Sequence, residues 1–74
     1  MIIAKPQNLY KLMAKKGFTG NRLAEKTGIT QGYMSYIIRG RRAVLPPTAK
    51  KICDALQCDF DEIFEIREEK IWKS

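Results

Sequence analysis

Histidine is absent from this sequence, and cysteine occurs only twice. Without histidine, the chain lacks the commonest general base and metal ligand of enzymes. Four residues separate Cys53 from Cys58, which is neither the spacing of a CxxC redox pair nor that of half a zinc site, and the sequence holds no second ligand pair. We therefore expect a protein that is not an enzyme and that needs no metal or other cofactor.

Long hydrophobic runs are also missing. Lysines at positions 5, 11, 15 and 16 interrupt the opening segment, so no stretch approaches the roughly 18 to 20 apolar residues of a membrane span. The start MIIAKPQ is too short an apolar segment for a secretory signal. We therefore expect a cytoplasmic protein with reduced cysteines and no membrane association.

Acidic residues are scarce in the first part of the chain. Residues 1 to 52 contain eleven lysines and arginines against Glu25 alone, a charge of +10, whereas residues 53 to 74 contain three basic and seven acidic residues, a charge of −4. The two parts sum to the net charge of +6. This asymmetry predicts a surface for a polyanion on the first part of the chain, the alternative being a basic protein without such a partner.

The apolar residues of the sequence repeat at the three- and four-residue spacings of helices. Thr19 and Thr30 have the positions of N-caps, glycines or prolines separate most segments, and Asp59 and Glu62 have capping-box spacing. Only the two ends have room for a short strand. With 74 residues, 45% of them hydrophobic, we predict one all-α domain over residues 1–74, with its core in 8–66 and a tail at 67–74. Its five short helices are expected at 7–17, 19–28, 30–40, 46–56 and 59–66.

The second and third predicted helices are joined by the short segment GIT, residues 28 to 30. A connection of three or four residues with a glycine is typical of a helix-turn-helix. Ala24 lets the two helices approach closely, and Ile29 is expected to fill the turn from the core side. In this arrangement the third helix, at about residues 30–39, is the one presented to a major groove of DNA.

The ordered set of Leu9 and Leu12, FTGNRLAEKTGIT, then Met34, Ile37 and Gly40, and AKKICDALQCDFDEIF resembles the Cro/CI-type helix-turn-helix family of bacterial and phage repressors. The resemblance covers roughly residues 8 to 66. It implies a lambda-repressor-like DNA-binding domain, a double-stranded DNA partner read in the major groove, and a place in the nucleoid of a prokaryotic cell. So short a regulator is also similar to those of phages and mobile elements.

The resemblance further implies which residues contact DNA. Those at the base edges are expected to be Gln31, Gly32, Tyr33 and Tyr36. Those at phosphates are expected to be Gly20, Asn21, Arg22, Thr30, Ser35, Arg39, Arg41 and Arg42. Family members commonly have glutamine where this chain has Gly20, so that side-chain contact is lost here. The alternatives are that Tyr33 packs on the second helix, that Gly32 reflects drift at a tolerant position, and that the arginines are solvated loop charges.

The acidic end of the chain is the expected dimer surface. Phe64, Ile66, Ile71 and Trp72 exceed what a minimal core of five helices needs, and MIIA at the start could pair with this segment or with its copy in a second chain. The alternative is that Trp72 covers its own core. A single helix-turn-helix reads few base pairs, so a homodimer on an inverted repeat is expected.

The expected function is that of a sequence-specific DNA-binding regulator, most simply a repressor that covers a promoter. The alternative is a protein-interaction module of the same fold, such as an antitoxin or a regulator whose binding face is covered by an antirepressor. A basic recognition face favours DNA as the partner, whereas binding through the apolar acidic end favours a protein antagonist.

Overall fold

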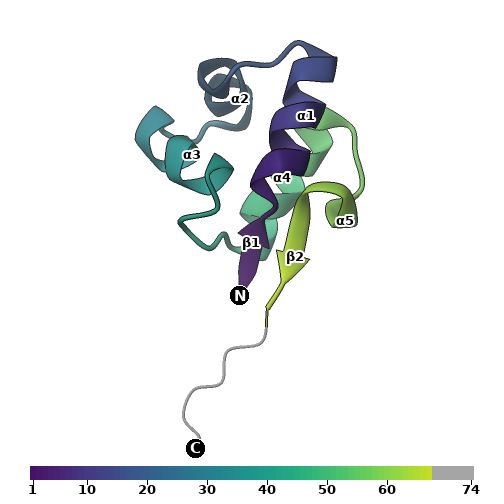
Figure 1. The fold of residues 1–74 in the computed structure, drawn as a ribbon. Helices are drawn as coiled ribbons and strands as arrows, with labels where there is room; N and C mark the ends of the chain where they lie inside the picture. The colour runs from purple at the N-terminus through teal and green to yellow at the C-terminus, as the bar shows by residue number, and fades with distance from the viewer. Residues whose placement is uncertain (68–74) are drawn as a thin grey trace, which may run out of the picture.

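Five helices and two short strands make up residues 1–67, the part of the chain that the computed structural model describes. The elements follow the order β1 (Ile2–Ala4), α1 (Pro6–Lys16), α2 (Gly20–Thr27), α3 (Gln31–Ile38), α4 (Pro46–Leu56), α5 (Phe60–Ile63) and β2 (Phe64–Ile66). In Figure 1, α2 and α3 lie together on one side of α1 and α4, and the two strands lie side by side below the helices. The predicted five helices and the pairing of the two ends are confirmed. No helix within residues 1–67 has the length and apolar character needed to cross a membrane.

Local capping signals set the bounds of the two helices that matter most. The Thr19 hydroxyl oxygen accepts a hydrogen bond from the Arg22 backbone N–H at 3.1 Å, and the Thr30 hydroxyl oxygen accepts one from the Tyr33 N–H at 3.3 Å. Gly28 ends α2 in the left-handed conformation, with a φ of 76°. These contacts satisfy backbone groups that helix ends otherwise leave unpaired. The predicted N-caps and the glycine stop after α2 are therefore confirmed.

The last predicted helix is shorter than expected. The capping box of Asp59 and Glu62 is present, with the Asp59 N–H donating to the Glu62 carboxylate at 2.8 Å, but the helix ends at Ile63. Phe64–Ile66 forms β2, which pairs antiparallel with β1 in the register Ile2↔Ile66, Ile3↔Glu65 and Ala4↔Phe64. Residues 64–66 were predicted to continue the helix. Instead they form a strand that pairs with β1, at the other end of the chain.

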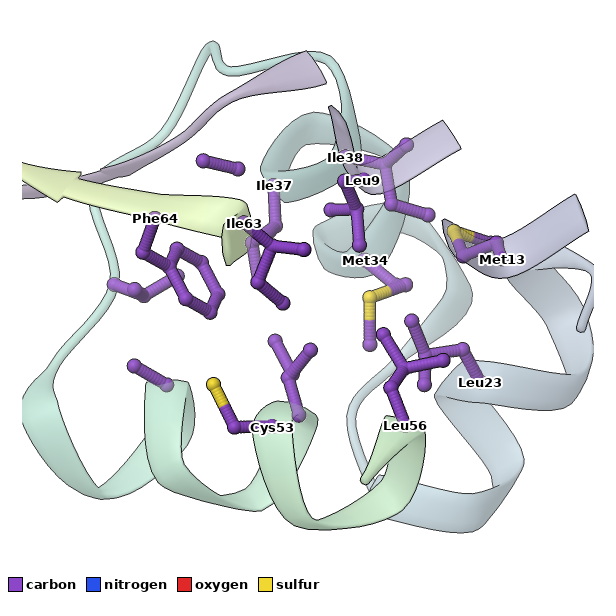
Figure 2. Close-up of a cluster of buried hydrophobic side chains, with 14 of the residues drawn as sticks. Leu9, Met13, Leu23, Met34, Ile37, Ile38, Cys53, Leu56, Ile63 and Phe64 are labelled. Atoms are coloured by element: carbon purple, nitrogen blue, oxygen red, sulfur yellow. The ribbon is translucent and has the colours of Figure 1, made fainter. Parts of the chain in front are cut away.

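Side chains from all five helices and from both strands form one hydrophobic core, most of which is drawn in Figure 2. Met34 and Ile37 of α3 point into it with 1% and 0% of their surface exposed, because residues three apart lie on the same face of a helix. Figure 2 shows Met34 between Leu9 of α1 and Leu56 of α4. The core therefore fixes α3 against the rest of the domain through one of its faces only.

Phe64 belongs to this core. Its side chain is fully buried, and its ring centroid lies 5.5 Å from that of Phe60. The prediction that Phe64 contacts a second subunit is wrong, because β-pairing turns this side chain inward. Ile66, two residues on, is 70% exposed. The other two predicted dimer contacts, Ile71 and Trp72, lie outside the described residues.

The two cysteines lie at the end of α4. Cys53 is buried in the core, and Cys58 is half-buried. Burial raises the pKa of the Cys58 thiol to about 12 and also raises the pKa of Cys53. Both thiols therefore stay protonated at neutral pH, and a protonated thiol is a poor nucleophile.

Gly40, which follows α3, is in the left-handed conformation and lies against the end of β1 and the start of α1. Its φ is 73°, and a Cβ at this position would lie 3.1 Å from the Pro6 Cγ and 3.3 Å from the Ala4 carbonyl oxygen. We expect Gly40→Ala to lower the free energy of unfolding by about 2 to 3 kcal/mol, from backbone strain and crowding together.

Gly28→Ala is the matched control for this variant. Gly28 has a similar φ of 76° but nothing within 4 Å of the added Cβ, so only the backbone cost of about 1 kcal/mol is expected. Urea denaturation of the two variants measures the difference. Equal losses would show that the crowding of Gly40 against Pro6 and Ala4 contributes nothing.

Candidate nucleic-acid interface

The turn between α2 and α3 is held by short-range contacts. The Ile29 N–H donates to the Ala24 carbonyl at 3.1 Å, and the Ile29 side chain packs against the core, as predicted. Ala24 and Leu23 are buried, and the buried Thr27 hydroxyl donates to the Leu23 carbonyl at 2.8 Å. α2 packs directly on α3 and α4. The two helices of the predicted helix-turn-helix are thus fixed relative to each other.

The outer face of α3 carries several of the predicted base contacts. Gln31 and Gly32 are exposed, and Tyr36 is 46% exposed. A Cβ added at Gly32 would meet no atom of the described residues within 4 Å. No packing contact within residues 1–67 therefore requires glycine at this position.

Tyr33 differs from the other predicted base contacts. Its side chain is half-buried against the core, and its hydroxyl donates to the Ala43 backbone carbonyl at 3.2 Å. This bond ties α3 to the segment before α4. The ring thus packs on the hydrophobic core, which leaves Gln31, Gly32 and Tyr36 as the open positions.

A hollow beside α3 brings together site residues from two separate segments. It lies between α1, the start of α2 and α3, and among the described residues no acidic side chain lines it. The predicted site residues that line it are Gly20, Asn21, Gln31, Ser35 and Arg39. Within this hollow the start of α2, a predicted phosphate site, adjoins the start of α3, a predicted base-reading site.

Tyr10 of α1 also lines this hollow and is 58% exposed. The sequence reading gave Tyr10 no role, because it lies outside the helix-turn-helix. One signal in the sequence could have indicated this role. Tyr10 is an aromatic residue that follows Leu9 but lies off the buried face of α1. The structure therefore adds one aromatic side chain to the candidate interface.

Two arginines flank the exposed ring of Tyr36. The guanidinium carbon of Arg39 lies 5.8 Å from the ring centroid, and that of Arg42 lies 5.6 Å from it. Both distances are within cation–π range. Arg39 also donates to the Ser35 hydroxyl at 2.5 Å. These contacts hold two positive charges at the end of α3, while Arg41 is exposed beside them.

The remaining predicted phosphate contacts lie around the helix starts. Arg22 is exposed, with its guanidinium carbon 6.0 Å from the centroid of the Phe18 ring, and Asn21 is exposed beside it. The Thr30 hydroxyl already accepts the capping bond of α3. Arg22 is thus positioned by an aromatic contact, as Arg39 and Arg42 are.

Within residues 1–67, the positive charges of this surface form no ion pairs with neighbouring acids. The ion pairs among residues 1–67 join Lys50 to Asp54 at 3.3 Å and Arg67 to Glu65 at 2.8 Å. Neither pair involves an arginine of α2, of α3 or of the loop that follows α3. A polyanion is therefore the partner that this surface suits by charge.

An exposed helix that packs on a second short helix across a glycine turn, flanked by arginines that form no ion pair within residues 1–67, defines the helix-turn-helix class of DNA-binding domains. Residues 8–69 match the family model of the Cro/C1-type HTH DNA-binding domain. The chain belongs to this family of DNA-binding transcriptional regulators, as its sequence resemblance indicated.

Similar proteins extend the comparison. The uncharacterized HTH-type transcriptional regulator YozG of Bacillus subtilis (strain 168) is 31% identical over 64 residues, which cover 85% of this chain and 76% of YozG. The restriction-modification controller protein C.AhdI from Aeromonas hydrophila is 30% identical with a TM-score of 0.70, over 77% of this chain and 86% of that one. The clp gene regulator ClgR from Corynebacterium glutamicum is 32% identical with a TM-score of 0.69, over 76% of this chain and 60% of ClgR. Two of these proteins are named as regulators and the third as a controller protein.

Proposed function

We propose that the protein is a sequence-specific repressor that binds an inverted-repeat operator as a homodimer and acts in the cytoplasm, at the nucleoid. The observation that carries this proposal is the outer face of α3, where exposed Gln31, Gly32 and Tyr36 lie between the start of α2 and the arginines after α3. A helix with such a face enters the major groove and reads base edges there. Repression then follows from covering a promoter.

Each open position on α3 has a distinct role in this proposal. The Gln31 amide pairs bidentately with the N6 and N7 of adenine, which its geometry suits. Tyr36 covers a thymine methyl with its ring. Gly32 lets the backbone of α3 approach the base edges, because a side chain there would point into open space. Tyr33 supports the helix from behind through its bond to Ala43.

Phosphate contacts surround these positions and set the register of the protein on DNA. The backbone N–H groups of Gly20 and Asn21 lie in the first turn of α2, where a phosphate oxygen can bind. The side chains assigned to phosphates are Tyr10, Arg22, Ser35, Arg39, Arg41 and Arg42, with Thr30 contributing at the start of α3. If about four to six phosphates are neutralised per protomer, log K should fall with log[salt] at about 0.9 per phosphate.

A pair of variants separates base reading from phosphate binding. We expect Gln31→Ala to relax the preference at one base pair of the half-site, reducing discrimination there by about 1 to 3 kcal/mol. Arg41→Ala should weaken binding to all sequences alike and reduce the salt slope by about 0.9. Fluorescence anisotropy on the operator and its single-base variants measures both effects. A Gln31→Ala protein that loses affinity equally for every duplex would contradict the assignment of α3 as the reading helix.

Gly32→Ala tests the close approach of α3. Because the new methyl group would touch no other part of residues 1–67, we expect the variant to be more stable by up to about 1 kcal/mol. Any loss of DNA affinity must then come from contact with DNA, and we expect at least a tenfold loss. Thermal unfolding and anisotropy are measured on the same sample. Unchanged affinity in a more stable protein would eliminate the close-approach role.

A further inference from the structure

β2 uses only one of its two edges for pairing within the chain. The Lys5 N–H donates to the Ile63 carbonyl at 2.7 Å, and the Arg67 N–H donates to the Met1 carbonyl at 2.8 Å. Hydrogen-bonded and non-hydrogen-bonded pairs alternate along an antiparallel ladder. With bonded pairs at Ile63 and Arg67, the register places Phe64 and Ile66 in non-hydrogen-bonded pairs. The N–H and C=O of Ile66 therefore point away from β1.

The other edge of the small sheet is already occupied. There the Val44 N–H donates to the Ile2 carbonyl at 2.9 Å, and the two residues form an isolated bridge. On β2, the Phe64 N–H bonds back to the Phe60 carbonyl. Within residues 1–67, the backbone groups of Ile66 have no partner, so Ile66 is the position on this open edge that offers both a donor and an acceptor.

The side chains of β2 restrict what can add to that edge. Glu65 and Arg67 share one face of the strand and form an exposed ion pair, and Ile66 stands on the other face, 70% exposed. A two-fold pairing of β2 with a second copy can be centred on Glu65, Ile66 or Arg67. Centring on Glu65 places two glutamates directly opposite each other, and centring on Arg67 does the same with two arginines. Like charges in such positions destabilise a strand pair. Centring on Ile66 places each Glu65 opposite Arg67 of the partner subunit.

We propose that a second copy of this chain adds to the open edge of β2, with Ile66 opposite Ile66 of the partner subunit. The two Ile66 residues exchange both backbone hydrogen bonds, and two ion pairs form between the subunits. The two small sheets then become one antiparallel sheet across a two-fold axis. This geometry rests on the proposed homodimer and gives it an interface. Because the contact is small and its ion pairs are exposed, the dimer is weak in solution and forms cooperatively on DNA.

The partner's Ile66 would also extend an existing apolar surface. Ile66 lines a hollow together with Ile2, Phe60 and Cys58. Cross-strand neighbours on one face of a sheet lie close enough for their side chains to touch. Ile66 of the partner subunit therefore lies beside the apolar residues of this hollow. It is on the face of the sheet opposite to the one that carries the ion pairs.

Charge reversal tests the register directly. Glu65→Arg and Arg67→Glu each place like charges opposite each other in a homodimer, so we expect each variant alone to self-associate about tenfold more weakly than the wild type. Mixed together, the two variants form a heterodimer in which both intersubunit pairs are complementary again. Sedimentation equilibrium at sub-millimolar concentration should show association recovered in the mixture.

The mixture also separates this proposal from a purely internal role. Each variant has lost the ion pair within its own chain, and mixing does not restore that pair. If Glu65 and Arg67 acted only within one subunit, the mixture would behave like the separate variants. That result, or single variants that associate as well as the wild type, would overturn the proposal.

Ile66→Pro tests the backbone bonds. It removes an N–H that has no acceptor within residues 1–67, so we expect an intact monomer that no longer self-associates, whereas the control Ile66→Val should associate normally. Binding to a duplex with one half-site should be unchanged in both, and cooperativity on the full operator should be lost only with proline. An Ile66→Pro protein that still dimerises, or a wild type that neither self-associates nor binds cooperatively, would overturn the interface. Failure of the wild type on a single half-site would instead count against the proposed DNA-binding function.

Discussion

Replacing Phe64 with alanine is expected to lower the free energy of unfolding by about 3 to 5 kcal/mol. The ring is fully buried and packs against Phe60, so the variant loses burial and leaves a cavity. A domain of this size is stable by roughly 4 to 11 kcal/mol, so the loss is a large share of the total. Urea denaturation followed by circular dichroism measures it.

Ile66→Ala is the matched control, since this side chain is 70% exposed in the single chain and should cost no more than about 0.5 kcal/mol. The concentration dependence of unfolding distinguishes the core role of Phe64 from the dimer role that the sequence suggested. A core residue gives the same loss at every protein concentration, whereas an interface residue gives a loss that changes with concentration. A concentration-dependent loss for Phe64→Ala would contradict its assignment to the core.

Removing the three arginines at the end of α3 is expected to weaken operator binding about 100-fold. Arg39, Arg41 and Arg42 are exposed and are not among the ion-paired residues of 1–67. A phosphate contact worth about 1 kcal/mol from each gives this loss when all three are changed to alanine. The slope of log K against log[salt] should become less steep by about 2.7, or 0.9 for each contact.

A control variant with the same change in net charge separates contact from overall charge. Lys11 and Lys15 line a hollow between α1 and α5, and Lys51 lines one between α2 and α4, and no residue of α3 lines either hollow. Changing these three lysines to alanine should lower affinity by less than about tenfold. If the lysine and arginine variants lose affinity equally, net charge and not the arginine cluster drives binding.

Local signals in the sequence were enough to predict the helix-turn-helix. Thr19 and Thr30 cap the helices that they precede, Gly28 takes the left-handed conformation after α2, and Met34 and Ile37 face the core. Each of these features depends on residues within one or two helical turns. Such features can be predicted from sequence because no distant partner decides them.

Features that depend on distant partners were predicted less well. The segment from Phe64 has helical spacing, but pairing with β1 at the other end of the chain makes it a strand and buries the ring. The roles of Tyr33 and Tyr10 are similar cases. The hydroxyl of Tyr33 is held by Ala43, and Tyr10 reaches the candidate interface through the packing of α1 beside α2 and α3.

The predicted contacts of the individual side chains with DNA are still predictions. Five of the residues predicted to contact DNA, from α2, α3 and the end of α3, line one hollow. The sequence of either helix alone could not have predicted this hollow. The arrangement of Arg39 and Arg42 around Tyr36 likewise depends on side-chain geometry that spacing does not determine. In this arrangement Tyr36 would position phosphate-binding arginines as well as contact a base.

The most direct test of the account is to select bound sequences from random duplex DNA with the wild-type protein. We predict enrichment of an inverted repeat whose half-sites are centred about one helical turn apart, roughly 10 base pairs. Affinity for the selected sequence should exceed that for random DNA by at least about 1,000-fold at physiological salt. A pool without an enriched sequence, together with weak binding that depends only on salt, would contradict a sequence-specific repressor and indicate a protein as the partner to identify.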